Sequence, residues 1–196
     1  MCKTNFSSTM KNKIISLILN LILFFILSYQ LNASEQAWSL AQEGNKIILI
    51  RHSLAPGGGD PAGFKIDDCK TQRNLNKKGI NQSKKIGKLF KKNKVPTDKV
   101  LTSQWCRCKD TAKYAFGEYE EFTALNSTFQ YPFDKNEGKQ LNELYNYVNK
   151  WNGNGKNLIL ITHYSIITAV TNAVPSSGEI VIADKNFKVL GTILTD

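Results

Sequence analysis

The fold of this chain is decided by residues 46–52, which read Lys46-Ile-Ile-Leu-Ile-Arg-His52. A continuous apolar run of this length is typical of a strand that is buried on both faces in a parallel sheet. A second run of the same kind, residues 158–162, is followed at once by His163. The carboxyl ends of parallel strands meet at one edge of a sheet, where α/β proteins bind their ligands. We therefore expect His52 and His163, the two histidines of the chain, to lie together at that edge.

Strands and helices alternate around these two runs. Residues 99–103 predict a third buried strand, and residues 75–92 predict a helix whose inward face is made of small and apolar residues: Gly79, Ser83, Ile86, Gly87 and Phe90. Further helices are predicted over 104–116, 137–151 and 166–173, an antiparallel strand pair over 178–183 and 188–194, and loops over 53–74 and 118–135. The helix over 137–151 should bury Leu141, Leu144, Tyr145 and Val148. This alternation predicts an α/β fold, a three-layer α/β/α sandwich with a mostly parallel central sheet.

The composition favours a folded protein that binds an anion. The chain has 196 residues, of which 41% are hydrophobic, with 26 basic residues against 16 acidic ones. A chain of this hydrophobicity is not disordered, and the lack of short repeats excludes collagen-like and solenoid folds. Only three basic residues are arginines, namely Arg51, Arg73 and Arg107. Because arginine offers a planar fork that lysine lacks, these positions point to bidentate binding of phosphate or carboxylate. For Arg73, an ion pair with Asp67 or Asp68 is an equal alternative.

Arg107 has a place that suits such a role. It follows the predicted strand over 99–103 by four residues, in the first turn of the next predicted helix. Free backbone amides and the positive end of the helix dipole make a helix N-terminus favourable for anions. We therefore expect Arg107 to join His52 and His163 at the edge of the sheet.

Residues 1–33 have the pattern of a secretory signal peptide. Lys3, Lys11 and Lys13 give a positive start, residues 14–27 are almost wholly apolar, and the segment that ends at Ala33 is polar and small. The apolar stretch would extend about 21 Å as a helix, less than the ~30 Å of a bilayer core. We predict cleavage after Ala33, leaving a domain of residues 34–196 in the periplasm or outside the cell. Retention of the segment as a membrane anchor is the alternative.

Several classes of partner are not expected. Cys106 and Cys108 are too close together for the usual zinc knuckle, so no metal site and no cofactor is predicted. The lysines of the helix over 75–92 lack interleaved aromatic residues and a recognition motif, so no nucleic-acid partner is predicted. Three cysteines follow residue 33, which in an oxidising compartment predicts one disulfide and one free thiol.

Four segments, taken in order, resemble the histidine phosphatase (phosphoglycerate mutase-like) superfamily. Arg51-His52-Ser53 resembles its Arg-His-Gly signature, and residues 74–82 (Asn-Leu-Asn-Lys-Lys-Gly-Ile-Asn-Gln) are similar to its Leu-Thr-x-x-Gly-x-x-Gln segment. Residues 102–112 (Thr-Ser-Gln-Trp-Cys-Arg-Cys-Lys-Asp-Thr-Ala) resemble Ser-Ser-Pro-Leu-x-Arg-Ala-x-Gln-Thr-Ala, and Thr162-His163 stands where the family has Gly-His or Thr-His. An exported bacterial subgroup of the superfamily is also similar in the sequences of residues 55–61 (APGGGDP), 67–75 (DDCKTQRNL), 103–108 (SQWCRC) and 177–182 (SGEIVI).

The resemblance implies a phosphoglycerate mutase-like fold and a phosphatase that needs no metal or cofactor. His52 would attack the phosphorus atom and form a phosphohistidine. Arg51, Arg107 and His163 would bind the non-bridging oxygens and stabilise the transition state. Ser53, at the place of the signature glycine, and Arg73 would contact the substrate.

The general acid of the family has no counterpart in the matched segments. Tyr164 follows His163, so the His-Asp donor of the acid phosphatase branch is absent, and the region of the mutase glutamate reads Ala-Leu-Asn-Ser over residues 124–127. Asp60 and Asp68, in the loop after His52, are the candidates for this role. Phosphohistidine and acyl phosphates have good leaving groups and would need no strong acid.

The resemblance also implies a disulfide pairing. Cys108 stands at a small alanine position of the family that faces the core, whereas Cys106 stands at a variable one. A Cys69–Cys106 disulfide with Cys108 free is therefore favoured, and Cys69–Cys108 is the alternative.

The function expected from the sequence is an exported phosphatase that hydrolyses a phosphorylated small molecule or envelope component through a phosphohistidine on His52. A catalytically silent phosphate-binding module of the same fold is one alternative, motivated by the missing acid. A membrane-anchored phosphohistidine phosphatase is the other. If the segment is cleaved, we expect the protein to contact the membrane only through residues 1–33, before cleavage.

Overall fold

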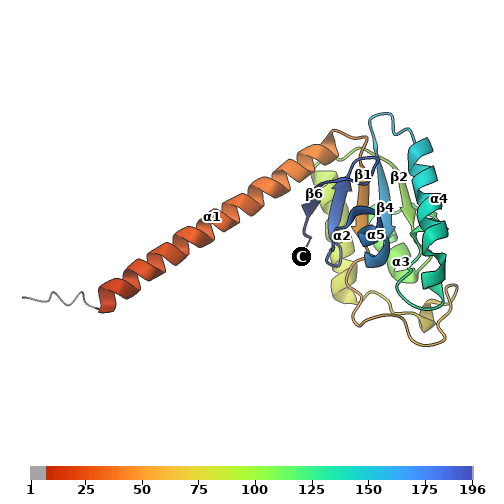
Figure 1. Ribbon diagram of the computed structural model, residues 1–196, viewed down its shortest axis with the longest axis horizontal. Helices are drawn as coiled ribbons and strands as arrows, with labels where there is room; N and C mark the ends of the chain where they lie inside the picture. The colour runs from red at the N-terminus through yellow and green to blue at the C-terminus, as the bar shows by residue number, and fades with distance from the viewer. Residues whose placement is uncertain (1–7, 196) are drawn as a thin grey trace, which may run out of the picture.

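The computed structural model describes residues 8–195 of the chain. Lys3 of the predicted signal segment lies outside the described residues, as do the side chains of residues 8–11 and 24–33. A six-stranded sheet forms the centre, and helices cover both of its faces (Figure 1). The three-layer α/β/α sandwich expected from the sequence is confirmed.

The sheet is mixed and has the strand order β3-β2-β4-β1-β5-β6. Strands β1 to β4 run parallel to one another, whereas β5 runs antiparallel to β1 and β6 antiparallel to β5. The strands are β1 Ile47–Arg51, β2 Thr97–Thr102, β3 Glu120–Glu121, β4 Asn157–Thr162, β5 Ile180–Ala183 and β6 Val189–Ile193. The predicted closing antiparallel pair is thus present at one edge, beside a parallel group that holds both histidine-bearing strands.

The register of the parallel strands brings their carboxyl ends to one level. Arg51 at the end of β1 pairs with Thr162 at the end of β4, so the next residues, His52 and His163, are neighbours. The His52 amide donates to the Thr162 carbonyl at 2.9 Å, which continues the ladder by one residue. On the other side of β4, the amide of Ser103 after β2 donates to the Ile161 carbonyl at 3.0 Å.

Two apolar cores lie on the two faces of the sheet, because successive side chains of a strand point to opposite faces. Ile47 and Leu49 of β1 belong to one core, which α4 and α5 cover together with the short helix η2. Ile48 and Ile50 belong to the other, which α2, α3 and the end of α1 cover. The helices are α1 Ser8–Gln42, α2 Lys77–Lys92, α3 Cys106–Phe116, α4 Glu137–Lys150, α5 Tyr164–Thr171, η1 Cys69–Thr71, η2 Thr123–Leu125 and η3 Phe133–Asn136.

Helix α2 packs closely on its surroundings, as its small residues predict. The five residues of its predicted inward face are its buried residues. A Cβ atom at Gly79 would overlap the backbone of Leu54, and one at Gly87 would overlap the backbone of Ala115. The helix begins at the side chain of Asn76, which accepts from the Gly79 amide at 2.9 Å. Glycine at position 79 therefore allows α2 to contact the chain just after His52.

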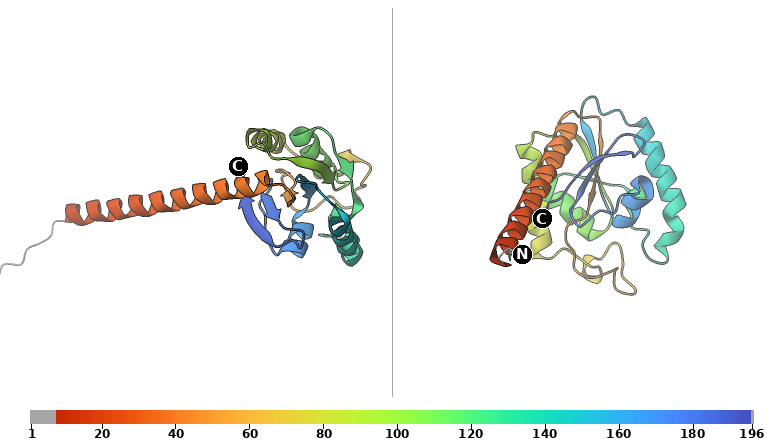
Figure 2. Two further views of the ribbon diagram at one scale, coloured as in Figure 1. Left: turned by 90° about the horizontal axis from the view of Figure 1, so that it is seen from above. Right: turned by 60° about the vertical axis from the view of Figure 1, so that its left-hand side comes forward.

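Helix α1 joins the domain through its last turns. Ala37, Trp38 and Ala41 are buried in the second core, and the Trp38 ring packs edge-on against Phe90 of α2. The side-chain amide of Asn157 at the start of β4 donates to the Ala41 carbonyl at 2.7 Å. The earlier part of α1 projects away from the sheet (Figure 2). Among the described residues, no helix is both long enough and apolar enough to cross a membrane.

Two details of the fold differ from the sequence prediction. Tyr145 of α4 is half exposed, because the inward position next to Leu144 is taken by Gln140, whose side-chain amide donates to the Asn126 carbonyl at 2.8 Å. The segment 118–135, predicted as loop, contains the short strand β3, the helix η2 and the start of η3.

Candidate functional site

A cavity of about 290 Å³ opens at the carboxyl edge of the parallel strands. Its walls come from the ends of β1 and β4, the first turn of α3, the glycines of loop 53–74 and the segment before η3. Arginine and histidine side chains supply its titratable groups, and the lining is Arg51, His52, Gly57, Gly58, Gly59, Arg73, Arg107, Ser127, Phe129, Gln130, His163, Tyr164 and Ser165. The strand-end residues that the sequence singled out thus share one hollow.

Another cavity, of about 540 Å³, is larger but lacks this chemistry. It lies beside α2 and is lined by Leu54, Lys78, Asn81, Gln82, Lys85, Ser176, Ser177 and Thr195. None of the three arginines or two histidines is among these residues. The smaller cavity is therefore the candidate functional site.

His52 is held in a single tautomer. Its Nδ1 lies 2.9 Å from the carbonyl oxygen of Ser53. Because a carbonyl oxygen only accepts hydrogen bonds, Nδ1 carries the ring proton and Nε2 has a free lone pair. Within the described residues, Nε2 has no hydrogen-bond partner. The imidazole is thus oriented with an unprotonated nitrogen available for a ligand.

His163 is held by the opposite nitrogen. Its Nε2 lies 2.8 Å from the hydroxyl of Ser103, and its Nδ1 lies 3.4 Å from Nη2 of Arg107. A guanidinium only donates, so Nδ1 accepts from Arg107 and Nε2–H donates to Ser103. The Ser103 hydroxyl in turn donates to Oδ1 of Asn126 at 3.2 Å. This chain of hydrogen bonds fixes the ring of His163 at the cavity wall.

Both imidazoles are neutral at neutral pH. Burial, followed by the positive charge of Arg107, lowers the pKa of His52 well below 6.5. The pKa of His163 is lowered by the same two causes, and the ring of His52, at 5.4 Å between centroids, adds to the effect. A neutral His52 is the form that could act as a nucleophile.

Arg107 is a buried cation with some of its donors unused. Its side chain is 3% exposed and pairs with the carboxylate of Asp60, with Nη1 at 2.8 Å from Oδ1 and 3.0 Å from Oδ2. Among the described residues its Nε is buried without a partner. Nε and Nη2 form one edge of the guanidinium, which can bind two oxygens of an anion side by side. Because one N–H of Nη2 is directed to His163, Nε and the second N–H of Nη2 are the donors left for a ligand in the cavity.

Arg51 and Arg73 are anchored by backbone carbonyls. Nη1 of Arg51 donates to the Pro175 carbonyl at 2.8 Å, and its guanidinium lies 5.7 Å from the centre of the Tyr164 ring. Arg73 donates through Nε to the Gly59 carbonyl at 2.9 Å and through Nη1 to the carbonyl of Ala55. No ion pair joins Arg73 to Asp67 or Asp68 among the described contacts. Partial burial lowers the pKa of both guanidinium groups, yet they remain cations.

Comparison with known proteins gives a likeness of structure and none of sequence. No protein-family model and no curated protein matches the chain. SixA from Agrobacterium tumefaciens, a candidate phosphohistidine phosphatase, is similar in structure with a TM-score of 0.53, 16% identity and coverage of 78% of this chain and 99% of that one. The protein histidine phosphatase SixA complexed with tungstate is similar with a TM-score of 0.51 and 15% identity, and the match covers 76% of this chain and 96% of that one. A candidate alpha-ribazole-5'-P phosphatase from Escherichia coli is similar with a TM-score of 0.52 and 13% identity, and the match covers 76% of this chain and 95% of that one.

This chain has the histidine phosphatase fold. The resemblance noted in its four sequence segments is therefore matched by its structure. The likeness covers about three quarters of the chain and almost the whole of each of these relatives.

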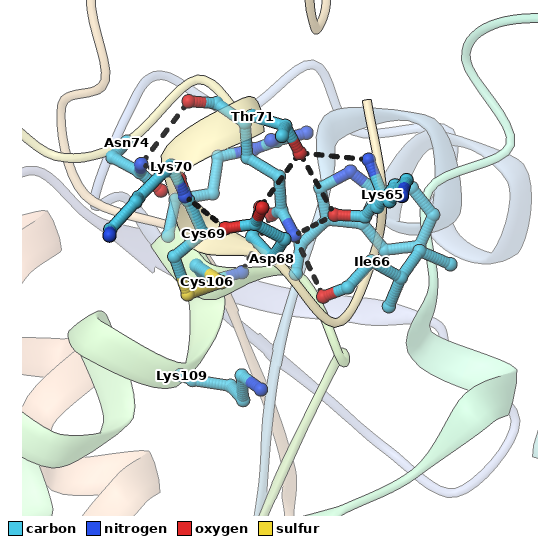
Figure 3. The surroundings of a disulfide bond; sticks show 12 residues. Lys65, Ile66, Asp68, Cys69, Lys70, Thr71, Asn74, Cys106 and Lys109 are labelled. Atoms are coloured by element: carbon cyan, nitrogen blue, oxygen red, sulfur yellow. Dashed lines mark hydrogen bonds between the residues drawn. A yellow bond between two sulfur atoms is a disulfide. The ribbon is translucent and has the colours of Figure 1, made fainter. Parts of the chain in front are cut away.

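Three residues expected at the site are not among those that line the cavity, namely Ser53, Asp60 and Asp68. Ser53 is fully buried and faces α2, where its hydroxyl accepts from Ser83 at 2.8 Å. Its contribution is the carbonyl that orients His52, so the structure corrects the expectation of a substrate contact through its side chain. Asp68 begins η1, where its carboxylate accepts from the Lys70 amide at 3.0 Å (Figure 3). It is not among the residues that line the cavity.

The disulfide that the sequence favoured is confirmed. Cys69 of η1 is bonded to Cys106 at the start of α3, with 5.6 Å between their Cα atoms (Figure 3). Cys108 is free and fully buried, with its sulfur 3.4 Å from Nε2 of His163. Burial raises the pKa of its thiol to about 12, so it remains a thiol. The disulfide ties loop 53–74 to the helix turn that carries Arg107.

Sequence reasoning missed several residues that line the cavity. Ser127, Phe129 and Gln130 come from the segment predicted as loop, and Tyr164 and Ser165 begin α5. No motif identified Phe129, Gln130 or Ser165. The resemblance marked Ser127 only as part of the segment at the place of the mutase glutamate, and Tyr164 only as the residue after His163. Among the described residues, no three His, Cys, Asp or Glu side chains are grouped so as to hold a metal ion.

Proposed function

We propose that this protein is an exported phosphatase that hydrolyses phosphomonoesters or similar phosphoryl groups through a phosphohistidine on His52. The observation that carries the proposal is the hydrogen bond from Nδ1 of His52 to the Ser53 carbonyl, which leaves Nε2 unprotonated. A nitrogen lone pair held beside arginines at a cavity wall is suited to attack phosphorus. The structural likeness to two phosphohistidine phosphatases and a ribazole-phosphate phosphatase supports the same chemistry.

The charges around the cavity suit a dianion. Three guanidinium groups, Arg51, Arg73 and Arg107, and one carboxylate, Asp60, leave a net charge of +2 when both histidines are neutral. A phosphomonoester carries two negative charges at neutral pH, whereas a phosphodiester carries one. The oxyanion tungstate bound to the SixA relative supports an anion site in this fold.

The reaction proceeds in two displacements. Nε2 of His52 attacks phosphorus and forms an N–P bond, while the bond to the leaving oxygen or nitrogen breaks and the leaving group departs with the electron pair. Arg51 and Arg107 hold the non-bridging oxygens, on which the negative charge is spread in the transition state. His163 joins them as a donor when its ring proton is on Nδ1, because the N–H on Nε2 is used by Ser103. A water molecule then attacks phosphorus, the N–P bond breaks, and phosphate and free His52 are formed.

The preferred substrates are those with good leaving groups. No carboxylic acid is among the residues that line the cavity, so a poor leaving group would depart without a protein proton donor. Phosphoramidates such as phosphohistidine, acyl phosphates and activated aryl phosphates meet this condition. A phosphorylated small molecule or envelope component of this kind is the substrate that we propose.

The test is turnover of p-nitrophenyl phosphate together with trapping of the phosphoenzyme. We expect an acid-labile, alkali-stable phosphoryl label on the wild type and none on His52→Ala. Loss of a nucleophile lowers the rate by several orders of magnitude, so retention of more than about a hundredth of the wild-type kcat by His52→Ala would overturn the covalent mechanism. Activity in EDTA should equal that in buffer, and a loss restored by Zn²⁺ or Mg²⁺ would contradict a metal-independent reaction.

A second candidate function is a silent phosphate-binding module of the same fold. The lack of an acid at the cavity favours it. It predicts phosphate binding with no turnover even of p-nitrophenyl phosphate, whose leaving group needs little protonation. The same assay therefore separates the two functions.

We also propose export of the mature protein, with membrane anchoring through residues 1–33 as the alternative. The disulfide between Cys69 and Cys106 is compatible with an oxidising compartment. Mass spectrometry of the mature N-terminus decides between them, since cleavage after Ala33 would leave Ser34 as the first residue.

A further inference from the structure

We propose that Asp60 is a positioning residue, whose carboxylate orients Arg107 and offsets its charge. This inference rests on the proposed phosphatase function, because it assigns the role of Asp60 in that reaction. It replaces the expectation of a general acid with a different role for the same residue.

The carboxylate of Asp60 is completely surrounded by donors. Oδ1 accepts from Nη1 of Arg107 at 2.8 Å and from the Arg73 amide at 3.0 Å. Oδ2 accepts from Nε1 of Trp105 at 2.9 Å and from Nη1 of Arg107 at 3.0 Å. The side chain is 2% exposed. Asp60 thus contacts three residues that surround the site, each through an N–H group.

This set of partners leaves no place for a proton on the carboxyl group. A protonated carboxyl is a donor and needs an acceptor, but the backbone amide, the indole and the guanidinium all only donate. Asp60 therefore has no proton to give to a leaving group.

The contacts instead fix the plane of Arg107. Asp60 binds Nη1 with both oxygens, which directs the opposite Nε–Nη2 edge away from the carboxylate. That edge includes the buried Nε without a partner, and Nη2 lies 3.4 Å from Nδ1 of His163. Trp105, held by the same carboxylate, packs edge-on against the His163 ring at 5.4 Å between centroids. One carboxylate thus sets the orientation of Arg107 and supports the packing of His163.

Asp60 also limits how tightly the site binds an anion. It carries the one negative charge among the four charged side chains described above. Removing that charge would raise the net charge from +2 to +3 and increase the attraction for phosphate, the product that must leave. Asp60 is therefore expected to raise kcat, by orienting Arg107, and to lower the affinity for phosphate, through its negative charge.

The experiment compares Asp60→Asn with Asp67→Asn, a matched change at an exposed position of the same loop. Substrates are p-nitrophenyl phosphate, with a good leaving group, and phenyl phosphate, with a poor one. We expect Asp60→Asn to lower kcat on the order of 100-fold, by the same factor for both substrates. We expect its inhibition constant for inorganic phosphate to fall by at least about threefold. Asp67→Asn should match the wild type in both measurements.

The outcomes separate the possible roles of Asp60. A loss at least about tenfold larger for phenyl phosphate would show a general acid and overturn the proposal. A lower melting temperature with unchanged kcat and phosphate affinity would show a purely structural role and would also overturn it. If Asp60 acts through Arg107, adding Asp60→Asn to the Arg107→Lys variant should lower kcat by less than about threefold relative to Arg107→Lys alone. If Asp60→Asn lowers kcat as much in the Arg107→Lys variant as in the wild type, Asp60 does not act through Arg107.

The binding measurement keeps this proposal distinct from the proposed function. If the wild type turns over no phosphate ester, the phosphatase function fails, and calorimetry with inorganic phosphate still tests the charge-balancing role of Asp60. Unchanged phosphate affinity in Asp60→Asn overturns that role whether or not the protein is an enzyme.

Discussion

Replacing Arg107 with lysine would test whether the site needs a guanidinium or only a positive charge. Of the donors of Arg107, Nη1 is used by Asp60 and one N–H of Nη2 is directed to His163, which leaves Nε and the second N–H of Nη2 for a phosphoryl group. A lysine amine has no guanidinium edge and could keep one contact, either with Asp60 or with the phosphoryl group. The variant therefore keeps the charge but loses a bidentate arrangement at the transition state.

The expected loss follows from these contacts. One hydrogen bond to a charged group contributes about 1.5–3 kcal/mol, and one well-placed donor to a developing anion about 2.7–4 kcal/mol. We therefore expect Arg107→Lys to lose about 2–4 kcal/mol of transition-state stabilisation, which corresponds to roughly a 30- to 1000-fold lower kcat/KM. Because Arg107 is buried against Asp60, the melting temperature should also fall, although less than on removal of the charge.

The assay is kcat/KM for p-nitrophenyl phosphate beside a melting curve. Lys109→Arg is the matched control, since Lys109 lies one half-turn further along α3 and pairs with Glu121 at 3.2 Å outside the cavity. The control should remain within about twofold of the wild type, as surface substitutions usually do. A kcat/KM of Arg107→Lys within about threefold of the wild type would refute the assignment of Arg107 as a phosphate ligand.

Two further predictions concern stability. The folded state lowers the pKa of His52 and His163, so below pH ~6.5 the unfolded chain binds more protons than the folded protein. As the pH falls below that value, each histidine should reduce the free energy of unfolding by up to about 1.4 kcal/mol per pH unit. Urea titrations at several values between pH 7.5 and 5.5 measure this slope; a His52→Gln variant with an undiminished slope would contradict the assignment. Replacing Cys69 and Cys106 with serine should cost up to about 4 kcal/mol, the loop-closure entropy for a separation of 37 residues, measured as the shift in urea midpoint. A double variant as stable as the wild type would show that the loop is ordered without the bond.

The sequence predicted the parts of the fold where one local pattern decides the structure. Ile47 to Ile50 alternate between two cores, and such a run has few stable places other than the centre of a sheet. The small inward face of α2 was found because Gly79 and Gly87 recur at helical spacing. His52 and His163 could be placed together because each directly follows a strand and parallel strands align their ends.

The remaining features depend on contacts between distant segments. Phe129 and Gln130 reach the cavity because of how their loop packs, and Gln130 is held by the amide of Asp60 at 2.8 Å, 70 residues away. Asp60 was recognised as an acidic residue near the site, but its three donors come from separate positions in the chain. The packing of Trp38 against Phe90 likewise has no local signal. Such roles follow from the completed tertiary structure.

The placement of Cys106 and Cys108 on either side of Arg107 has a consequence for how the protein reaches its active state. In an unfolded chain, Cys69 would meet either cysteine with nearly equal ease, because two extra residues hardly change the entropy of closing so long a loop. The correct partner is distinguished only once α3 has formed and Cys108 has been buried beneath His163. Oxidation before that point would trap part of the protein as the Cys69–Cys108 isomer, in which the cysteine next to His163 is pulled out of the core. The yield of active protein should therefore depend on the order of helix formation and oxidation, and on a disulfide isomerase where oxidation comes first.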